Sequence, residues 1–479
     1  MSGRIVRLLG VGALVFLMLL PSMHIYAQDG TWVSSIQVQN LGDEPANIVI
    51  EYYDQDGNRI DAATQLFADL QPGASVNAYA PSIAGLPDGF IGSAVVYSDQ
   101  PVAAIGNLTD IFSPTTVGSS SYGGVGAPAS EVYLPLVMRA YGGSNWDTEI
   151  AVQNCGASEA DITITFYDSA GNPIPAATEN ATIQPSASNV FGQADNAGLS
   201  DGYIGSAVVQ TTSPDKVVGV IVNEIAGLRL VTYNGFASAE AGTTAYLPLI
   251  MNHYGGSDWV TSFQVMNVGT ADASITIEYY SAGSTTPDKT VKYDGVENPM
   301  IGPMSSINRF QPAVDSDLGT GWIGAVQVTS NNGQPIVAIG NEAALAAGKA
   351  GATSYNAFKA GATEVNLPLV MLNYGGSNWV TSFQVMNVGT ADADVTIEYY
   401  AIGSTIPDKT VHYDGVENPL IPPLNAINRY QPGVDSGLGM GWIGAVQVTS
   451  NNGQPVVAIA NESALGKSGD VSTTYNGLW

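Results

Sequence analysis

The chain has 479 residues, a formal net charge of −28 and one cysteine, Cys155. A negative field of this size repels phosphate backbones and anionic lipid surfaces, so nucleic acid is excluded as a partner. A single cysteine cannot form an intrachain disulfide, and stability must therefore come from apolar cores. Charged residues make up 12% of the chain and apolar residues 45%, a balance that favours sheets and turns over helices or disorder.

The first residues are typical of a secretory signal peptide. Arg4 and Arg7 form a charged start, residues 11–20 form an apolar run, and Ile25-Tyr26-Ala27 forms a small-residue exit. The apolar run has about 10 residues, whereas a membrane-spanning helix needs roughly 20. We therefore expect residues 1–27 to be removed, leaving a secreted or cell-surface protein with no membrane span and two fewer positive charges.

A unit of roughly 115 residues occurs four times, which is a usual size for one sandwich domain. In each copy, a Trp precedes a strand-like segment that ends in Asn, and a Tyr-rich segment then alternates between apolar and polar residues. Alternation of this kind predicts half-buried strands. A Gly-aromatic-Ile-Gly signature begins a later strand, at Gly89–Gly92, Gly202–Gly205, Gly321–Gly324 and Gly441–Gly444.

Short strands separated by Gly, Pro, Asn and Asp favour an all-β fold over a parallel sheet with crossover helices. We predict four tandem immunoglobulin-like β-sandwich domains in an elongated array. The expected domains are residues 28–130, 131–242, 243–361 and 362–479. The third and fourth copies are nearly identical over long runs. Recent duplication of this kind suits a spacer or a multivalent binder better than an enzyme.

Three local patterns in the first copy support a family resemblance. They are an Asn-x-Gly turn after the first strand, a Tyr-Tyr strand followed by the run Asp54–Asn58, and a Gln-Pro-Gly-x-Ser turn at Gln71–Ser75. The copies resemble the immunoglobulin-like modules of bacterial extracellular proteins, including those called cell-adhesion-related domains. The resemblance implies a fold and an extracellular setting, and it implies no ligand. The later part of each copy extends beyond the compact form of that module.

An apolar segment built on Leu-Pro-Leu lies at each junction, at Tyr133–Met138, Tyr246–Met251 and Asn366–Met371. Proline is tolerated only on an edge strand or at a strand's start, and we interpret each segment as the first strand of the domain that follows. The alternative is that each segment closes the domain before it, which would leave the fourth copy incomplete instead of the first. After signal removal the first copy has no comparable segment. One domain would then have an open edge that could accept a partner's strand, and coverage of this edge by the domain's own loops is the alternative.

The sequence offers little for catalysis. His24 lies in the expected signal peptide, and His253 and His412 have no counterparts in the other copies, so a histidine-based triad is not expected. The run Asp54–Asn58 resembles the start of a calcium loop but lacks the later glutamate, and a hairpin turn is the preferred interpretation. We therefore predict no catalytic residue, no metal and no cofactor.

An Asn-Glu pair recurs at one strand end, as Asn223-Glu224, Asn341-Glu342 and Asn461-Glu462. Two carboxylates that flank a sugar linkage can hydrolyse it, but a second acid at a matching place is not evident. An Asn that bonds turn backbone is the preferred interpretation.

The best binding candidates are four tryptophans at one position of the repeat, with three polar neighbours. They are Trp32, Trp146, Trp259 and Trp379, with Asn145, Asp258 and Asn378. An exposed indole can stack on a sugar face while its polar neighbours bond the hydroxyls. Packing in a core or between domains is the alternative, because Trp is usually highly buried.

These observations predict a secreted structural or adhesive repeat protein that is not an enzyme. Its expected partners are cell-surface or extracellular proteins or polysaccharides, with a second copy of the chain as a further alternative. A multivalent carbohydrate-binding protein that uses the four tryptophans is the second hypothesis. A glycoside hydrolase is the third and least favoured.

Overall fold

The computed structural model describes residues 14–16, 32–110, 118–212, 216–227, 229–347, 349, 351–466 and 471–479. The signal peptide expected at residues 1–27 lies outside these residues except for Leu14–Phe16. The described residues form eight antiparallel sheets, two for each repeat, which confirms the all-β tandem sandwiches. None of their helices is long and apolar enough to cross a membrane.

The described residues of the four repeats form the same strands in the same order, and repeat 2 adds one short strand. Repeat 1 contains β1 (Leu14–Phe16), β2 (Trp32–Asn40), β3 (Ala46–Asp54), β4 (Gln65–Leu70), β5 (Ser75–Tyr79), β6 (Gly92–Ser98), β7 (Val102–Asp110) and β8 (Ser119–Gly123). Repeat 2 contains β9 (Glu131–Arg139), β10 (Asp147–Asn154), β11 (Ala160–Tyr167), β12 (Glu179–Ile183), β13 (Ser188–Gly192), β14 (Tyr203–Thr211), β15 (Val218–Ala226), β16 (Arg229–Asn234) and the short β17 (Phe236–Ala237).

Repeats 3 and 4 follow the same plan. Repeat 3 contains β18 (Thr244–Asn252), β19 (Trp259–Asn267), β20 (Ile275–Ser281), β21 (Lys289–Tyr293), β22 (Ser306–Phe310), β23 (Trp322–Ser330), β24 (Ile336–Ala344) and β25 (Ala352–Asn356). Repeat 4 contains β26 (Glu364–Leu372), β27 (Trp379–Asn387), β28 (Val395–Ala401), β29 (Lys409–Tyr413), β30 (Ala426–Tyr430), β31 (Trp442–Ser450), β32 (Val456–Ala464) and β33 (Val471–Asn476).

The described helices are single turns at the ends of the sandwiches. They are α1 (Gln311–Val314), α2 (Gln431–Val434), η1 (Asp61–Ala63), η2 (Ala80–Ser82), η3 (Pro175–Ala177), η4 (Gln193–Asp195), η5 (Ser238–Glu240), η6 (Ser316–Leu318) and η7 (Ser436–Leu438).

Each sandwich has an inner and an outer sheet. The inner sheets have the strand orders β5-β2-β7-β8, β13-β10-β15-β16, β22-β19-β24-β25 and β30-β27-β32-β33. The outer sheets have the orders β1-β6-β3-β4, β12-β11-β14-β9-β17, β18-β23-β20-β21 and β26-β31-β28-β29. Because β9, β18 and β26 pair within the repeat that follows each junction, the Leu-Pro-Leu segments are the first strands of those repeats.

The Asn that ends the first inner strand fixes the turn after it. Asn40 is fully buried, and its Nδ2 donates to the carbonyls of Glu44 and Leu70, at 2.8 Å each. Its Oδ1 accepts the Gly42 N–H at 2.8 Å. Asn154, Asn267 and Asn387 make the equivalent three bonds. A buried backbone needs such partners, which explains why this Asn recurs.

The second Gly of the Gly-aromatic-Ile-Gly signature makes room for the aromatic ring two residues before it. A Cβ at Gly92 would lie 2.1 Å from the Tyr53 carbonyl oxygen and 2.6 Å from the Phe90 ring. Any side chain there would therefore displace the ring or the neighbouring strand.

A proline fits into each Leu-Pro-Leu strand because the strand is bulged there. In β18 the register with β23 shifts between Leu247 and Ile250. The bulge leaves the Leu249 carbonyl without a strand partner, and the Tyr355 hydroxyl donates to it at 2.6 Å. Tyr233 and Tyr475 donate to Leu136 and Leu369 in the same way.

In the described part of the chain, the first strand of repeat 1 is short. Residues Leu14–Phe16 form β1, which pairs with Val96–Ala94 of β6. The equivalent strand of repeat 2 is β9, which pairs with β14 over its whole length. This strand falls inside the expected signal peptide. Cleavage after Ala27 would remove the described neighbour of β6 at this edge.

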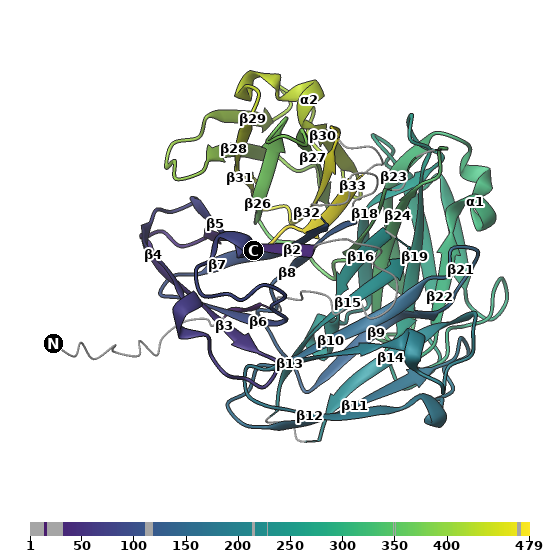
Figure 1. The fold of residues 1–479 in the computed structure, drawn as a ribbon. Coiled ribbons are helices and arrows are strands. Elements are labelled where there is room, and N and C mark those ends of the chain that lie inside the picture. Colours follow the sequence, from purple (N-terminus) through teal and green to yellow (C-terminus); the bar gives the residue numbers. More distant parts are fainter. Residues whose placement is uncertain are drawn as a thin grey trace.

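The four sandwiches close into a ring. The last inner strands meet at its centre, with contacts of β8 with β16, β16 with β25, β25 with β33, and β33 with β8. In Figure 1 repeat 4 (green to yellow) lies beside repeat 1 (purple), and β26 of repeat 4 contacts β2 and β7 of repeat 1. We expected an elongated array, and on this point the expectation was wrong. An extended chain would expose apolar residues that the inner sheets of repeats 3 and 4 carry on one face, such as Met266 and Val337, and in the ring a neighbouring repeat covers them.

The first strand of one repeat covers the inner sheet of the next. β9 contacts β19 and β24, β18 contacts β27 and β32, and β26 contacts β2 and β7. Apolar side chains therefore join cores across the interfaces. Met266, Val337 and Ile339 of repeat 3 belong to the core of repeat 2, and the equivalent residues of repeat 4 belong to the core of repeat 3.

Asparagine side chains link the last strands at the centre. Asn356 Nδ2 donates to the Asn234 carbonyl at 2.7 Å, and Asn356 Oδ1 accepts the Asn234 N–H at 3.0 Å. The Asn476 side chain makes the same pair of bonds to the backbone of Asn356. The Asn234 side chain makes the same pair of bonds to the backbone of Gly123. We call each pair of bonds a rung.

Repeats 3 and 4 share a buried ionic network that the sequence analysis did not identify. The Asp315 carboxylate accepts from Arg309 Nε at 3.2 Å and from the Tyr279 hydroxyl at 2.7 Å, and Lys289 Nζ lies 2.9 Å away. Repeat 4 contains the same network, formed by Asp435, Arg429, Tyr399 and Lys409. Burial opposes ionisation of Asp315, but the bonds from Arg309, Tyr279 and Lys289 outweigh it, so its pKa lies below the usual range.

We expect Asn356→Ala to lower the free energy of unfolding by about 1–3 kcal/mol, because the Asn234 backbone groups lose their partners. Urea unfolding monitored by circular dichroism measures the change. Asn180→Ala, which removes an exposed amide, is the matched control and should change stability by less than about 0.5 kcal/mol. Equal effects of the two substitutions would contradict a role for the rung.

We expect Asp315→Asn to destabilise the chain by about 3–5 kcal/mol, since Arg309 would stay buried without its charge partner. Asp317→Asn, which changes an exposed partner of Lys289, should cost less than about 1 kcal/mol. Because the Asp315 pKa is lowered by folding, its contribution is present at neutral pH and is lost as the pH falls into the acid range. Urea unfolding at pH 7 and pH 3 tests both statements.

Candidate functional site

The glycine-rich loops before three of the tryptophans are tight hairpin connections. The Tyr141 N–H donates to the Trp146 carbonyl at 2.9 Å, and the reverse bond has the same length. The residue before each Trp has a left-handed backbone, with φ of 52° at Asn145, 56° at Asp258 and 50° at Asn378. Asn and Asp tolerate this conformation better than most residues, so the turn alone accounts for their presence.

The four tryptophans are half-buried, and the fold does not bring them together. Trp146, Trp259 and Trp379 pack against the cores of repeats 2, 3 and 4, and Trp32 packs against a small cluster between repeats 1 and 2. Packing of this kind reduces the indole area that a sugar could stack on. Sugar binding by these residues stays a prediction.

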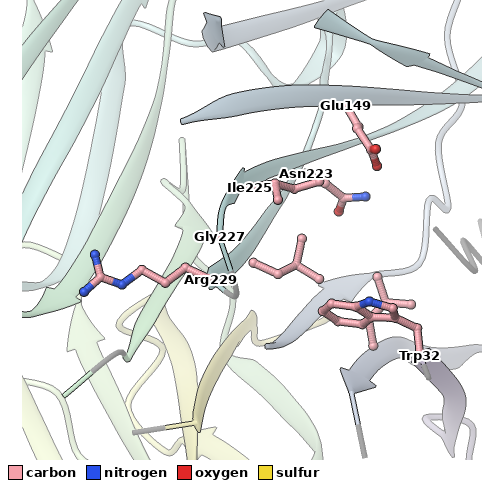
Figure 2. Close-up of a pocket in the computed structure, with 8 residues that line it drawn as sticks. Trp32, Glu149, Asn223, Ile225, Gly227 and Arg229 are labelled. Carbon is pink, nitrogen blue, oxygen red and sulfur yellow. The ribbon is translucent and has the colours of Figure 1, made fainter. Parts of the chain in front are cut away.

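Trp32 lines a pocket at the junction of repeats 1 and 2 (Figure 2). The other lining residues are Leu108 of repeat 1 and Glu149, Asn223, Ile225, Gly227, Arg229 and Leu230 of repeat 2. The empty volume is about 270 Å³ with the open mouth included. Only a small group could enter it.

Glu149 and Asn223 are the polar side chains that face the indole. They are cross-strand partners on β10 and β15, and Figure 2 shows both pointing toward Trp32, while the Arg229 guanidinium points away. Burial raises the pKa of Glu149 to about 7. Its Oε2 is buried without a hydrogen-bond partner. Acceptor groups beside an aromatic face suit a small hydrogen-bond donor, such as a hydroxyl or an ammonium group.

Glu149 belongs to a set of four buried carboxyl groups. Glu224, Glu342 and Glu462 occupy one position of repeats 2, 3 and 4, where repeat 1 has Leu108. At the adjacent position, repeat 2 has Glu149 where the other repeats have Ser35, Ser262 and Ser382. Repeat 1 therefore lacks the carboxyl that its counterparts carry, and repeat 2 supplies one beside Leu108. Glu149 was not among the residues predicted from the sequence, although its place among serines is a visible signal.

The recurrent Asn residues have structural partners. The Thr232 hydroxyl donates to Asn223 Oδ1 at 2.8 Å, and Ser354 and Thr474 donate to Asn341 and Asn461. Asn461 Nδ2 also donates to Glu342 Oε2 at 3.3 Å across the interface of repeats 3 and 4. Of these bonds, only the one from Asn461 to Glu342 crosses an interface. The others join side chains of neighbouring strands, so the expectation that this Asn bonds turn backbone was wrong.

The run at Asp54 is a turn. Asp54 Oδ1 accepts the N–H groups of Asp56 at 3.0 Å and Asn58 at 2.8 Å, and Gly57 has φ of 83°. The carboxylate is therefore engaged with its own loop, as the hairpin interpretation requires. In the described part of the chain, no group of three or more His, Cys, Asp or Glu residues could hold a metal ion.

No protein-family model and no curated protein matches this chain. Among solved structures, it is similar to Thermotoga maritima 1070, with 18% identity, a TM-score of 0.19, and coverage of 23% of this chain and 96% of that one. It is also similar to the Anabaena sensory rhodopsin transducer, with 15% identity, a TM-score of 0.16, and coverage of 20% and 94%.

A third similarity, to the pilus adhesin SpaC from Lactobacillus rhamnosus GG, has 10% identity and a TM-score of 0.11, and it covers 93% of this chain and 57% of that one. Similarities at these scores carry no functional argument.

We expect Glu342→Gln to make the chain less sensitive to alkaline pH. Burial raises the pKa of Glu342 to about 8 from 4.5, so the unfolded chain releases this proton at a lower pH than the folded chain. Stability of the natural chain therefore falls as the pH rises from about 4.5 to 8. The variant should be more stable than the natural chain at pH 9, by about 2 kcal/mol or more, and similar to it at pH 5.

Urea unfolding from pH 5 to pH 9 measures this difference. Glu44→Gln, which changes an exposed carboxyl group, is the control and should follow the natural chain at every pH. A Glu342→Gln curve parallel to the natural one would show that folding does not raise the pKa of this carboxyl group.

Proposed function

We propose that this chain is an extracellular structural or adhesive protein without catalytic activity, and that it acts as a rigid four-part ring. The observation that supports this proposal is the closure of the ring, in which the last inner strands contact one another around the centre. A closed ring holds repeated surface groups at fixed separations, which favours multivalent contact. The proposed partners are cell-surface or extracellular proteins or polysaccharides.

Secretion is part of this proposal. The charged and apolar start at residues 1–27 supports it, and so does the net charge of −28, which favours solubility and disfavours nucleic acid. The single cysteine, Cys155, is compatible with an oxidising compartment because it has no intrachain partner to pair with.

Repeats 3 and 4 each expose an equivalent pair of apolar side chains beside a short helix. Phe310 and Val314 are 40% and 47% exposed, and Tyr430 and Val434 are 45% and 49% exposed. Exposed apolar groups of this kind often mark contact surfaces. Two equal contacts on one rigid body would raise the apparent affinity for a repetitive partner above that of either contact alone.

A second candidate function is recognition of a small sugar by the pocket of repeats 1 and 2. The indole of Trp32, with the Glu149 carboxyl group and the Asn223 amide facing it, favours this candidate. Sugar recognition by this pocket needs only Trp32, and the other three tryptophans would then have packing roles.

Binding of the secreted chain to the surface fraction and the purified wall polysaccharide of its producing cell tests the proposal. Phe310→Ser and Tyr430→Ser should each weaken retention by about 10- to 100-fold, because the loss of either contact removes the avidity of the pair. The double variant should weaken retention further, since neither contact then remains. Leu66→Ser, which changes an exposed apolar residue present in repeat 1 alone, is the matched control.

Three results would count against the proposal. They are the absence of retention on every surface component, equal effects of the double variant and the control, and turnover in a broad hydrolase screen. Loss of polysaccharide retention in Trp32→Ala alone would favour the sugar candidate instead.

A further inference from the structure

The interface between repeats 4 and 1 differs from the other three. The other three interfaces each join repeats that follow one another in the sequence. The interface of repeats 4 and 1 joins the two ends of the array. Asparagine rungs join the first three pairs. Among the described residues, no hydrogen bond joins repeat 4 to repeat 1, although β33 contacts β8 and Ile105 packs into the core of repeat 4. We call this interface the seam.

The missing rung has a simple cause. The residue that would form it is Gly123, the counterpart of Asn234, Asn356 and Asn476, and glycine has no side chain. A Cβ at Gly123 would have ordinary contacts, at 3.7 Å from Leu478 Cδ2 and 3.9 Å from Asn234 Oδ1. The backbone of Gly123 does not have a positive φ. An asparagine is therefore compatible with this position.

The apolar contact of repeat 1 with its neighbours is also smaller. The inner-sheet face that packs on the preceding repeat carries Met266, Val337 and Ile339 in repeat 3. The equivalent residues are Gln39, Ala103 and Ile105 in repeat 1, and Gln153, Gly219 and Ile221 in repeat 2. Both interfaces of repeat 1 therefore bury less apolar side-chain volume than the interface of repeats 2 and 3. Contact between repeats 1 and 2 rests on a separate small cluster that includes Leu108, Ile221 and Leu230.

We propose that the seam and the interface of repeats 1 and 2 open, and that repeat 1 exchanges with repeat 1 of a second copy of this chain. The seam has no covalent link, and its two surfaces are complementary, so the same contacts can form between two chains. The linker of residues 124–130 between β8 and β9 then passes from one ring to the other. In the resulting dimer each ring contains repeats 2, 3 and 4 of one copy and repeat 1 of the other.

This inference goes beyond the proposed function and does not depend on it. Closed monomer and exchanged dimer contain the same interfaces, so their equilibrium is set by concentration and by the linker. The seam contributes to the rate instead, because the seam must open, together with the interface of repeats 1 and 2, before either form converts to the other. A stronger seam therefore slows exchange in both directions and leaves the final dimer fraction unchanged.

The test uses the full chain, its Gly123→Asn variant and the control Gly143→Asn, whose added side chain meets nothing within 4 Å. Each is incubated at high concentration below its unfolding temperature, and dimer formation is followed by size-exclusion chromatography with light scattering. The natural chain should form a dimer slowly, and the isolated dimer should persist for a time after dilution. Gly123→Asn should slow formation and decay about tenfold, as expected for one restored pair of hydrogen bonds. The control should change neither rate by more than about twofold.

A second measurement does not depend on the variants. Unlabelled and isotope-labelled monomers are mixed, incubated and analysed by native mass spectrometry, and mixed-mass dimers should appear at the rate of dimer formation. The proposal is overturned if the chain stays monomeric at every concentration. It is also overturned if the dimer forms and dissociates at once on dilution, or if Gly123→Asn and Gly143→Asn exchange at the same rate.

Discussion

The structure depends on how the edge strands of the four inner sheets are covered. β8, β16, β25 and β33 each end a sheet, and an uncovered edge offers unpaired N–H and C=O groups to any other strand. In this chain the four edges face one another around one centre, where asparagine amides take the place of a neighbouring strand. An amide carries a donor and an acceptor, so one side chain can satisfy both backbone groups of the residue opposite.

Closure of the ring also decides what kind of core each repeat needs. The outer face of an inner sheet lies beneath the first strand of the preceding repeat, and so it carries Met266 and Val337 where an isolated sandwich would carry polar side chains. The repeats are thus not independent domains that stand in a row. Their cores are continuous across the interfaces of repeats 2, 3 and 4, and this continuity is weakest at repeat 1.

The repeats diverge in their polar groups more than in their strands. Repeats 3 and 4 hold a buried arginine and aspartate beside a tyrosine, whereas the hydroxyl of Tyr52 at the equivalent place in repeat 1 is buried without a partner. The buried carboxyl groups also differ between repeats. In repeat 1, Leu108 stands where the other repeats have a glutamate. In repeat 2, Glu149 stands where the other repeats have a serine, and it lines the same pocket as Leu108. Departures from the repeat therefore gather at the junction of repeats 1 and 2, where the pocket is.

The sequence alone determined the strands, the sandwiches and the fourfold repetition, because alternation of apolar residues and the position of turn residues are local properties that survive in any arrangement of the copies. It also placed the Leu-Pro-Leu segments correctly in the following repeats, since proline restricts a strand locally. Only the tertiary structure decided that the array closes, that Gly123 leaves a rung unmade, and that Trp32 meets Glu149. These facts depend on the angle at which one repeat packs on the next, and that angle arises from contacts between residues more than 100 positions apart.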